Sequence, residues 1–345
     1  MGPTPIDLAF ILPEGSQAVS GGNVYNDCLV RALREKRAVA TMDVSELGRR
    51  IARGDEGTYI LDTLDMGAMA TLPLRSAAQK IALLVHHLPS LEPGSDPSSA
   101  ARRVEDDALP RFDAFVTTSP FTTAWLAERG ITPEAVATVT PAVSIARDAP
   151  RRYDPPLRAA MVGNIIARKG IAPFLEALDR QMTAGDRFSI ELVGRLDLEP
   201  HYARACRAVV SGSPGLVARA HFSGPVPHER VADVYRGAHA LVSASQMETF
   251  GMSLQEARAH GLPILALDGG HAAAHFTDGR EGLLLSSPDA LAGAFLGLAR
   301  DAAKMRAFFE RAQTTPPPAP YTWSDAADSL LFQLDRCFAR RVANR

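Results

Sequence analysis

The sequence predicts an α/β protein made of two Rossmann-like, doubly wound domains that face each other across a cleft. Short apolar runs alternate with helical patterns along the chain, a proline-rich segment interrupts the alternation near its middle, and the alternation then starts again. Strands that alternate with helices form βαβ units and parallel sheets. The length of 345 residues fits two domains better than one.

The first half contains the predicted elements of the first domain. We expect strands at 6–12, 38–42, 58–61, 80–86, 113–119 and 135–140, and helices at 24–37 and 120–129. The run at 80–86 (KIALLVH) is almost entirely apolar, which is typical of a strand buried on both faces of its sheet.

Residues 148–156 (DAPRRYDPP) carry three prolines and form the predicted linker, because proline interrupts both helices and strand ladders. Beyond the linker we expect strands at 157–162, 188–193, 240–243, 263–267 and 283–285, and helices at 170–181, 199–210, 228–236, 251–260 and within 288–312. A last amphipathic helix is predicted at 325–338, where apolar residues recur at helical spacing.

Composition excludes several classes of function. A net charge of -2 and a pI near 6.5 argue against a dedicated nucleic-acid binder. The three cysteines, Cys28, Cys206 and Cys337, are far apart and predict free thiols in a reducing cytoplasm. No apolar run is long enough to cross a membrane, and the N-terminus is interpreted as a first strand instead of a signal peptide.

The most informative segment is 243–263 (SASQMETFGMSLQEARAHGLP). Glu248 follows a predicted strand, Phe250 and Gly251 come next, and a helix begins around Met252. Glu256 lies on that helix, eight positions after Glu248. The unpaired N–H groups of a helix N-terminus suit a sugar diphosphate, while carboxylates can bind sugar and ribose hydroxyls.

This segment resembles the E-x7-E signature of retaining GT-B glycosyltransferases, family 4 type (glycosyl transferases group 1). Other segments resemble that family's motifs in the same order: the glycine-rich loop at Gly21 and Gly22, the active-site histidine segment 84–88 (LVHHL), the lysine loop 161–170 (MVGNIIARKG), the base-binding loop 222–226 (FSGPV), the closing loops at 268–282, and the start of the last helix at 321–324. The resemblance implies an acceptor-side domain at 1–148, completed by the helix 325–345, and a nucleotide-sugar-binding domain at 149–324.

The resemblance also implies roles for individual residues. The catalytic candidates are His86, Lys169 and Glu248. The donor-binding candidates are Gly21, Gly22, Asn164, Arg168, Arg195, Val226, Phe250, Gly251, Met252, Ser253 and Glu256. The family usually has an arginine after the glycine of the lysine loop, but this sequence has Asn164 there, so either Arg168 or Arg195 is expected to supply the second positive charge.

The expected reaction is transfer of a sugar from a nucleotide-diphosphate sugar to an unidentified small-molecule, glycan or lipid acceptor, with retention of the anomeric configuration. No resident cofactor is expected, and no metal, because Asp62 and Asp65 have the wrong spacing for a metal–diphosphate site and no obvious partners. Three alternatives stay open: a nucleotide-sugar epimerase, a phosphorylase, and a noncatalytic sugar-nucleotide-binding subunit. A peripheral membrane contact also stays open, because 31–37 and 49–53 are basic.

Overall fold

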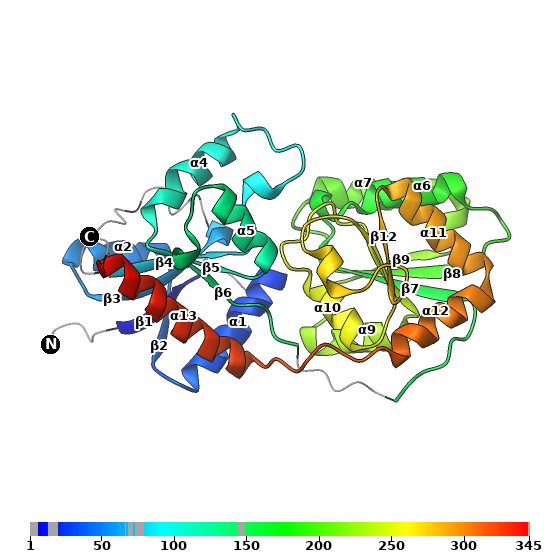
Figure 1. Ribbon diagram of the computed structural model, residues 1–345. Helices are drawn as coiled ribbons and strands as arrows, with labels where there is room; N and C mark the ends of the chain where they lie inside the picture. Colours follow the sequence, from blue (N-terminus) through cyan, green and yellow to red (C-terminus); the bar gives the residue numbers. More distant parts are fainter. Residues whose placement is uncertain are drawn as a thin grey trace. The chain divides into compact units, whose positions relative to one another are not determined.

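The computed structural model describes residues 6–12, 20–65, 67, 72, 79–143 and 149–343 (Figure 1). The chain forms two compact units. Unit 1 comprises residues 1–142 together with 321–345, and unit 2 comprises residues 143–320. Each unit contains one six-stranded sheet with helices packed against it, so the predicted α/β class with two doubly wound sheets is confirmed.

The sheet of unit 1 is parallel, with the strand order β2-β1-β3-β4-β5-β6. The strands are β1 (Ile6–Ile11), β2 (Val39–Met42), β3 (Gly57–Asp62), β4 (Gln79–Val85), β5 (Ala114–Thr117) and β6 (Val136–Thr138). The strand order reverses between β1 and β3, which is where doubly wound sheets bind ligands beyond the carboxyl ends of their strands. Residues 81–85 of β4 are all buried, as the apolar run predicts.

The described helices of unit 1 include two that sequence patterns did not reveal. They are α1 (Gly21–Arg34), α2 (Val44–Arg53), α4 (Ala100–Ala108), α5 (Pro120–Glu128) and α13 (Trp323–Ala343). Neither α2 nor α4 was predicted. The signals for α2 are its caps, since Asp43 accepts a hydrogen bond from the Glu46 N–H (2.7 Å) and Gly54 ends the helix with a φ of 78°.

The last helix, α13, packs on α1, β5 and β6 of unit 1. Its buried residues include Ala326, Leu330, Leu334 and Phe338, which recur at helical spacing. Gln333 adds two hydrogen bonds to the backbone of Thr138, one at 3.0 Å and one at 2.9 Å. Residues from the far end of the sequence therefore complete the core of unit 1.

The sheet of unit 2 is also parallel, with the strand order β12-β11-β10-β7-β8-β9. The strands are β7 (Leu157–Val162), β8 (Phe188–Val193), β9 (Ala220–Gly224), β10 (Ala240–Ser243), β11 (Ile264–Leu267) and β12 (Gly282–Leu285). The order reverses between β7 and β10. The segment 222–226 was predicted to be a loop, but 222–224 belong to β9, which pairs with β8.

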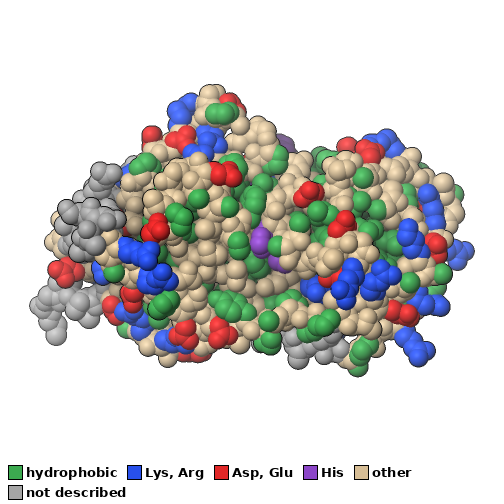
Figure 2. Space-filling view, in the orientation of Figure 1, with side chains coloured by type: hydrophobic (Ala, Val, Ile, Leu, Met, Phe, Trp, Pro, Cys, Tyr) green, Lys and Arg blue, Asp and Glu red, His purple; other side chains and the backbone are tan. Residues whose placement is uncertain are grey.

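The described helices of unit 2 are α6 (Ile171–Gln181), α7 (Pro200–Gly212), α8 (Pro214–Val217), α9 (His228–Gly237), α10 (Met252–Ala259), α11 (Pro288–Arg300) and α12 (Ala302–Thr314). In Figure 1 the strands of this unit lie between α6 and α7 on one side and α9 on the other. Figure 2 shows acidic and basic side chains interspersed on the visible surface of each unit, in keeping with the small net charge.

Candidate active site

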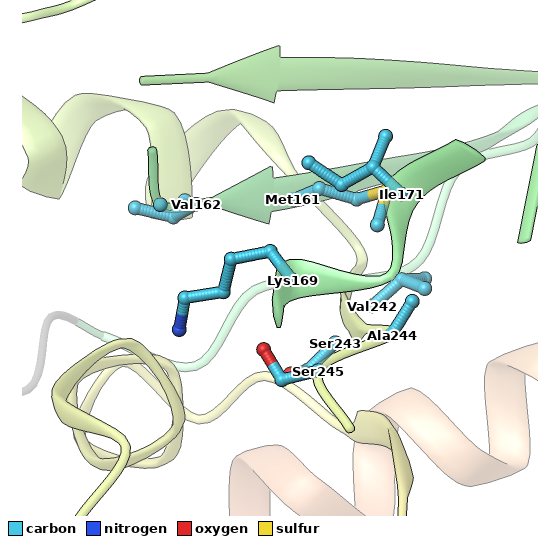
Figure 3. Close-up of a pocket in the computed structure, with 9 residues that line it drawn as sticks. Met161, Val162, Lys169, Ile171, Val242, Ser243, Ala244 and Ser245 are labelled. Atoms are coloured by element: carbon cyan, nitrogen blue, oxygen red, sulfur yellow. The ribbon is translucent and has the colours of Figure 1, made fainter. Parts of the chain in front are cut away.

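A pocket lies at the strand-order reversal of unit 2, at the carboxyl ends of β7 and β10 (Figure 3). It is lined by Met161, Val162, Gly163, Lys169, Ile171, Val242, Ser243, Ala244 and Ser245. In Figure 3 the Lys169 and Ser245 side chains point toward the same space. Residues of the predicted lysine loop and of the segment that precedes Glu248 therefore line the same pocket.

Lys169 and Glu248 form a buried ion pair beside this pocket. The Lys169 Nζ donates a hydrogen bond to Glu248 Oε1 at 2.5 Å, and the side chains are only 18% and 7% exposed. Lys169 ends a short 3-10 helix after β7, whereas Glu248 follows β10. The strand order thus brings together two residues that are 79 positions apart.

The local charges decide the protonation of this pair. Burial lowers the pKa of Lys169, and Arg168 lowers it further, while Glu248 opposes both effects. Burial by itself raises the pKa of Glu248, but the positive charges of Lys169 and Arg168 and a hydrogen bond from Ser245 leave that pKa below its ordinary value. Glu248 is therefore an ionised carboxylate at neutral pH, held in place by three groups.

The backbone around Lys169 packs tightly against the loop after β10. Gly170 has a φ of 60°, and a Cβ there would lie 2.1 Å from the carbonyl oxygen of Ala244, so only glycine fits. The Arg168 carbonyl accepts a hydrogen bond from the Gln246 N–H at 3.2 Å, and its guanidinium donates one to the Met247 carbonyl at 3.3 Å. Arg168 is therefore fixed beside the Lys169–Glu248 pair.

Asn164 and Arg195 lie at the neighbouring strand ends. The side-chain oxygen of Asn164 accepts a hydrogen bond from the Arg195 N–H at 3.3 Å, linking the loop after β7 to the loop after β8. The Arg195 guanidinium forms a two-pronged ion pair with Asp197, at 2.9 and 2.7 Å. Of the two predicted second cations, Arg168 is the one that acts on the charges of both Lys169 and Glu248.

The N-terminus of α10 lies next to Glu248. Gly251 caps this helix with a φ of 93°, so Met252 and Ser253 form its first turn. Phe250 stacks on His271, with ring centroids 5.5 Å apart, and the Phe250 carbonyl accepts a hydrogen bond from His275 Nε2 at 2.6 Å. The two histidines, which sequence analysis missed, therefore orient the turn that opens the helix.

Glu256 lies one turn into α10 and has a buried partner. The Tyr235 hydroxyl donates a hydrogen bond to Glu256 Oε2 at 2.7 Å and lies 3.4 Å from the Ser253 carbonyl. Tyr235 is 1% exposed and stacks on His260. The predicted donor residue Val226 lies in the loop between β9 and α9, and α9 carries Tyr235.

In unit 1, His86 directly follows β4 and is 8% exposed. Its Nε2 lies 2.9 Å from Asn26 Oδ1 and 3.5 Å from Asp62 Oδ2. Gly21 and Gly22 open α1 above it, and a Cβ at Gly22 would lie 3.2 Å from the His86 ring. The glycine pair and the histidine, predicted separately, therefore belong to one cluster within unit 1.

Asp62, for which the sequence offers no obvious metal-site partner, has hydrogen-bond partners of another kind. Its carboxylate accepts hydrogen bonds from the Asn26 side chain and from the Leu64 N–H (2.8 Å), and it is 2% exposed. The sequence did not show the Asn26 contact, because Asn26 on α1 and Asp62 at the end of β3 meet only once the sheet has formed. Among the described residues no group of three or more His, Cys, Asp or Glu is placed to hold a metal ion, and no helix is long and apolar enough to span a membrane.

Comparison with known proteins supports the resemblance. Residues 156–301 match the family of glycosyl transferases group 1. A D-inositol 3-phosphate glycosyltransferase of Rhodococcus opacus is 27% identical over 267 residues, which are 70% of this chain and 57% of that protein. The one from Nocardia farcinica is 37% identical over 123 residues, which are 34% of this chain and 26% of that protein. The chain thus spans between about a quarter and just over half of these relatives, and the match to the glycosyl transferases group 1 family lies within unit 2.

Solved structures show the same fold over almost the whole chain. A sucrose-phosphate synthase from Thermosynechococcus elongatus matches with a TM-score of 0.75 and 20% identity, covering 98% of this chain and all of that one. Anabaena HepE in complex with UDP and glucose matches with a TM-score of 0.73 and 15% identity, covering 95% and 99%. The GT-B fold that the sequence resemblance implied is thereby confirmed.

Proposed function

We propose that this chain, whose second unit contains the match to the glycosyl transferases group 1 family, transfers a sugar from a nucleotide-diphosphate sugar to an acceptor hydroxyl with retention of configuration. The observation that carries the proposal is the buried Lys169–Glu248 pair between the strand-end pocket and the N-terminus of α10. An ammonium and a helix N-terminus suit a diphosphate, because both stabilise negative charge.

In the proposed reaction, the bond between the anomeric carbon and the β-phosphate oxygen breaks, and the acceptor oxygen bonds to that carbon from the same face. The acceptor proton moves to the departing phosphate oxygen. Negative charge grows on the diphosphate, where Lys169, with Arg168 beside it, would lower the barrier. Glu248 would hold Lys169 and accept hydrogen bonds from sugar hydroxyls, while Glu256 would bind the ribose.

The nucleotide and the acceptor can be identified in two steps. Calorimetry with nucleoside diphosphates and their sugars would begin with uridine and guanosine compounds, and an acceptor screen would follow with the tightest donor. A retaining transferase yields a product with the anomeric configuration of its donor. An epimerase would instead convert the donor without an acceptor, and a phosphorylase would require inorganic phosphate. A noncatalytic subunit would bind nucleotide and turn over nothing.

The two glutamates have separable roles under this proposal. Glu256→Gln should weaken binding of the nucleoside diphosphate itself, because the ribose contact is lost. Glu248→Gln should weaken binding of the sugar-bearing donor and spare the diphosphate. Equal effects of both substitutions on both ligands would contradict the assignment.

Full activity in excess EDTA is also expected, because Lys169 and helix N–H groups would neutralise the diphosphate charge without a metal. The measurement is the transfer rate with and without chelator. Activity that disappears on chelation and returns with magnesium or manganese would overturn the metal-independent mechanism.

A further inference from the structure

The His86 imidazole of unit 1 is backed by two buried polar side chains that no family motif assigns. Asn26 lies on α1 and Asp62 ends β3, and each is 2% exposed. The Asn26 side-chain nitrogen donates a hydrogen bond to Asp62 Oδ2, and Asn26 Oδ1 lies 2.9 Å from His86 Nε2. The three side chains form one continuous hydrogen-bonded chain.

The chemistry of the three groups determines which of them donates and which accepts in each hydrogen bond. A carboxylate only accepts hydrogen bonds, so the Asn26 amide must turn its NH₂ group toward Asp62 and its oxygen toward His86. That oxygen only accepts, so His86 Nε2 must carry a proton. Because burial lowers the pKa of His86 in spite of the nearby Asp62 charge, the ring is neutral at pH 7, and Nδ1 is its acceptor atom.

Neighbouring groups hold the ring in one orientation. Tyr25 meets it edge-on, with centroids 5.2 Å apart, and the Tyr25 hydroxyl is itself bound to the Val139 carbonyl at 2.9 Å. The backbone N–H of His86 donates a hydrogen bond to Thr63 Oγ1 at 3.0 Å. A Cβ at Gly22 would lie 3.2 Å from the ring, so a side chain there would press against it. The direction of the hydrogen bonds is therefore tied to a fixed ring.

We propose that Asp62 and Asn26 are positioning residues that keep the His86 proton on Nε2, so that Nδ1 accepts a hydrogen bond from a hydroxyl of the donor sugar. The sugar contact rests on the proposed function, whereas the position of the proton does not. A sugar hydroxyl that meets Nδ1 must donate, so a fluorine in its place would lose the contact.

Nitrogen-15 NMR of the histidine-labelled full chain tests the proton position directly. The His86 signals are identified by their loss in His86→Gln. We expect a protonated Nε2 and an unprotonated Nδ1 at neutral pH. In Asp62→Asn the residue-62 amide can donate or accept, Asn26 can turn over, and a mixture of tautomers should appear.

Glu92→Gln is the matched control, because Glu92 pairs with the adjacent His87 at 2.9 Å and is not one of the three side chains that are hydrogen-bonded in sequence to His86. It should leave the His86 signals unchanged. A proton on Nδ1 in the unsubstituted protein would overturn the proposal even if Asp62→Asn failed to fold. A folded Asp62→Asn with an unchanged His86 spectrum would overturn it as well.

The sugar contact is tested with a set of monofluorinated analogues of the best donor. One analogue should react roughly tenfold more slowly, the effect of one lost hydrogen bond. Asp62→Asn should slow the normal donor by a smaller factor, set by the fraction of rings whose proton has moved to Nδ1. It should slow that analogue no further, because the analogue cannot make the contact in either tautomer. Additive losses would refute the contact. A protein that turns over no donor would refute the proposed function and leave the NMR result standing.

Discussion

Replacing Lys169 by alanine removes an ammonium that lies 2.5 Å from Glu248 Oε1 in a largely buried site. One consequence is structural. Removing one partner of a buried ion pair typically lowers the free energy of unfolding by about 3–5 kcal/mol. The hydrogen bond from Ser245 to Glu248 places this loss near the lower end of that range. The other consequence is catalytic. Losing one preorganised group that faces developing negative charge typically costs about 3 kcal/mol of barrier, or about a hundredfold in rate.

A second substitution separates the two consequences. In Lys169→Ala/Glu248→Gln no buried carboxylate remains unpaired, so most of the stability should return. If Lys169 only neutralised Glu248, the double variant would transfer sugar as fast as Glu248→Gln alone. If Lys169 stabilises the leaving diphosphate, the double variant should remain about a hundredfold slower than Glu248→Gln.

The assay follows sugar transfer and donor hydrolysis in parallel, with thermal unfolding measured on every variant. Arg180→Ala is the control, because Arg180 belongs to the same unit but forms an exposed ion pair with Asp289 at 2.8 Å. Such pairs contribute about 0–1 kcal/mol to stability, so that variant should behave as the parent does. A Lys169→Ala rate within about threefold of the parent rate would refute the reasoning.

Three further outcomes are expected. Tyr235→Phe should weaken binding of the nucleoside diphosphate roughly tenfold by freeing Glu256 to rotate, and calorimetry with a dideoxyribose analogue should show no such loss. Gly22→Ala should shift the His86 ring, visible in its NMR signals, because the added methyl would lie 3.2 Å from it. Burial holds the pKa of His271 at about 4 in the folded state against about 6.5 unfolded, so its contribution to stability is present above about pH 6.5 and lost as the pH falls toward 4. His271→Gln should flatten that part of the stability–pH curve, and equal slopes would contradict this.

The fold was predictable because both sheets are parallel and buried. Every strand of unit 2 except β9 was predicted within about a residue, since apolar runs between helical patterns have few alternatives. Strand β9 (AHFSG) was missed because it is an edge strand with polar exposed positions, and such a strand lacks a continuous apolar run. Helix α2 was missed because its caps, not its composition, mark its ends.

The candidate site was predictable only for groups that lie in a local motif. Lys169, Glu248 and Glu256 each belong to a recognisable segment that follows a strand. Tyr235 gave no signal, because a tyrosine in a helix usually indicates core packing, and here its hydroxyl reaches a carboxylate 21 positions away. Its role depends on the hydrogen bond between a residue of α9 and a residue of α10, which no local pattern encodes.

Asp62 shows the same limit and points to a general difference between the two clusters. Near the pocket of unit 2, an ion pair holds the functional groups, and motif residues supply both charges. Around His86, the ring is held by the neutral Asn26 side chain of α1 and the buried Asp62 carboxylate that ends β3. Their effect depends on which atoms donate and which accept hydrogen bonds. A charged pair tolerates small rotations of its partners, whereas a directed chain fails when any one donor becomes an acceptor. Conservative amide–acid exchanges at Asn26 and Asp62 should therefore disturb His86 more than their nearly unchanged size would suggest.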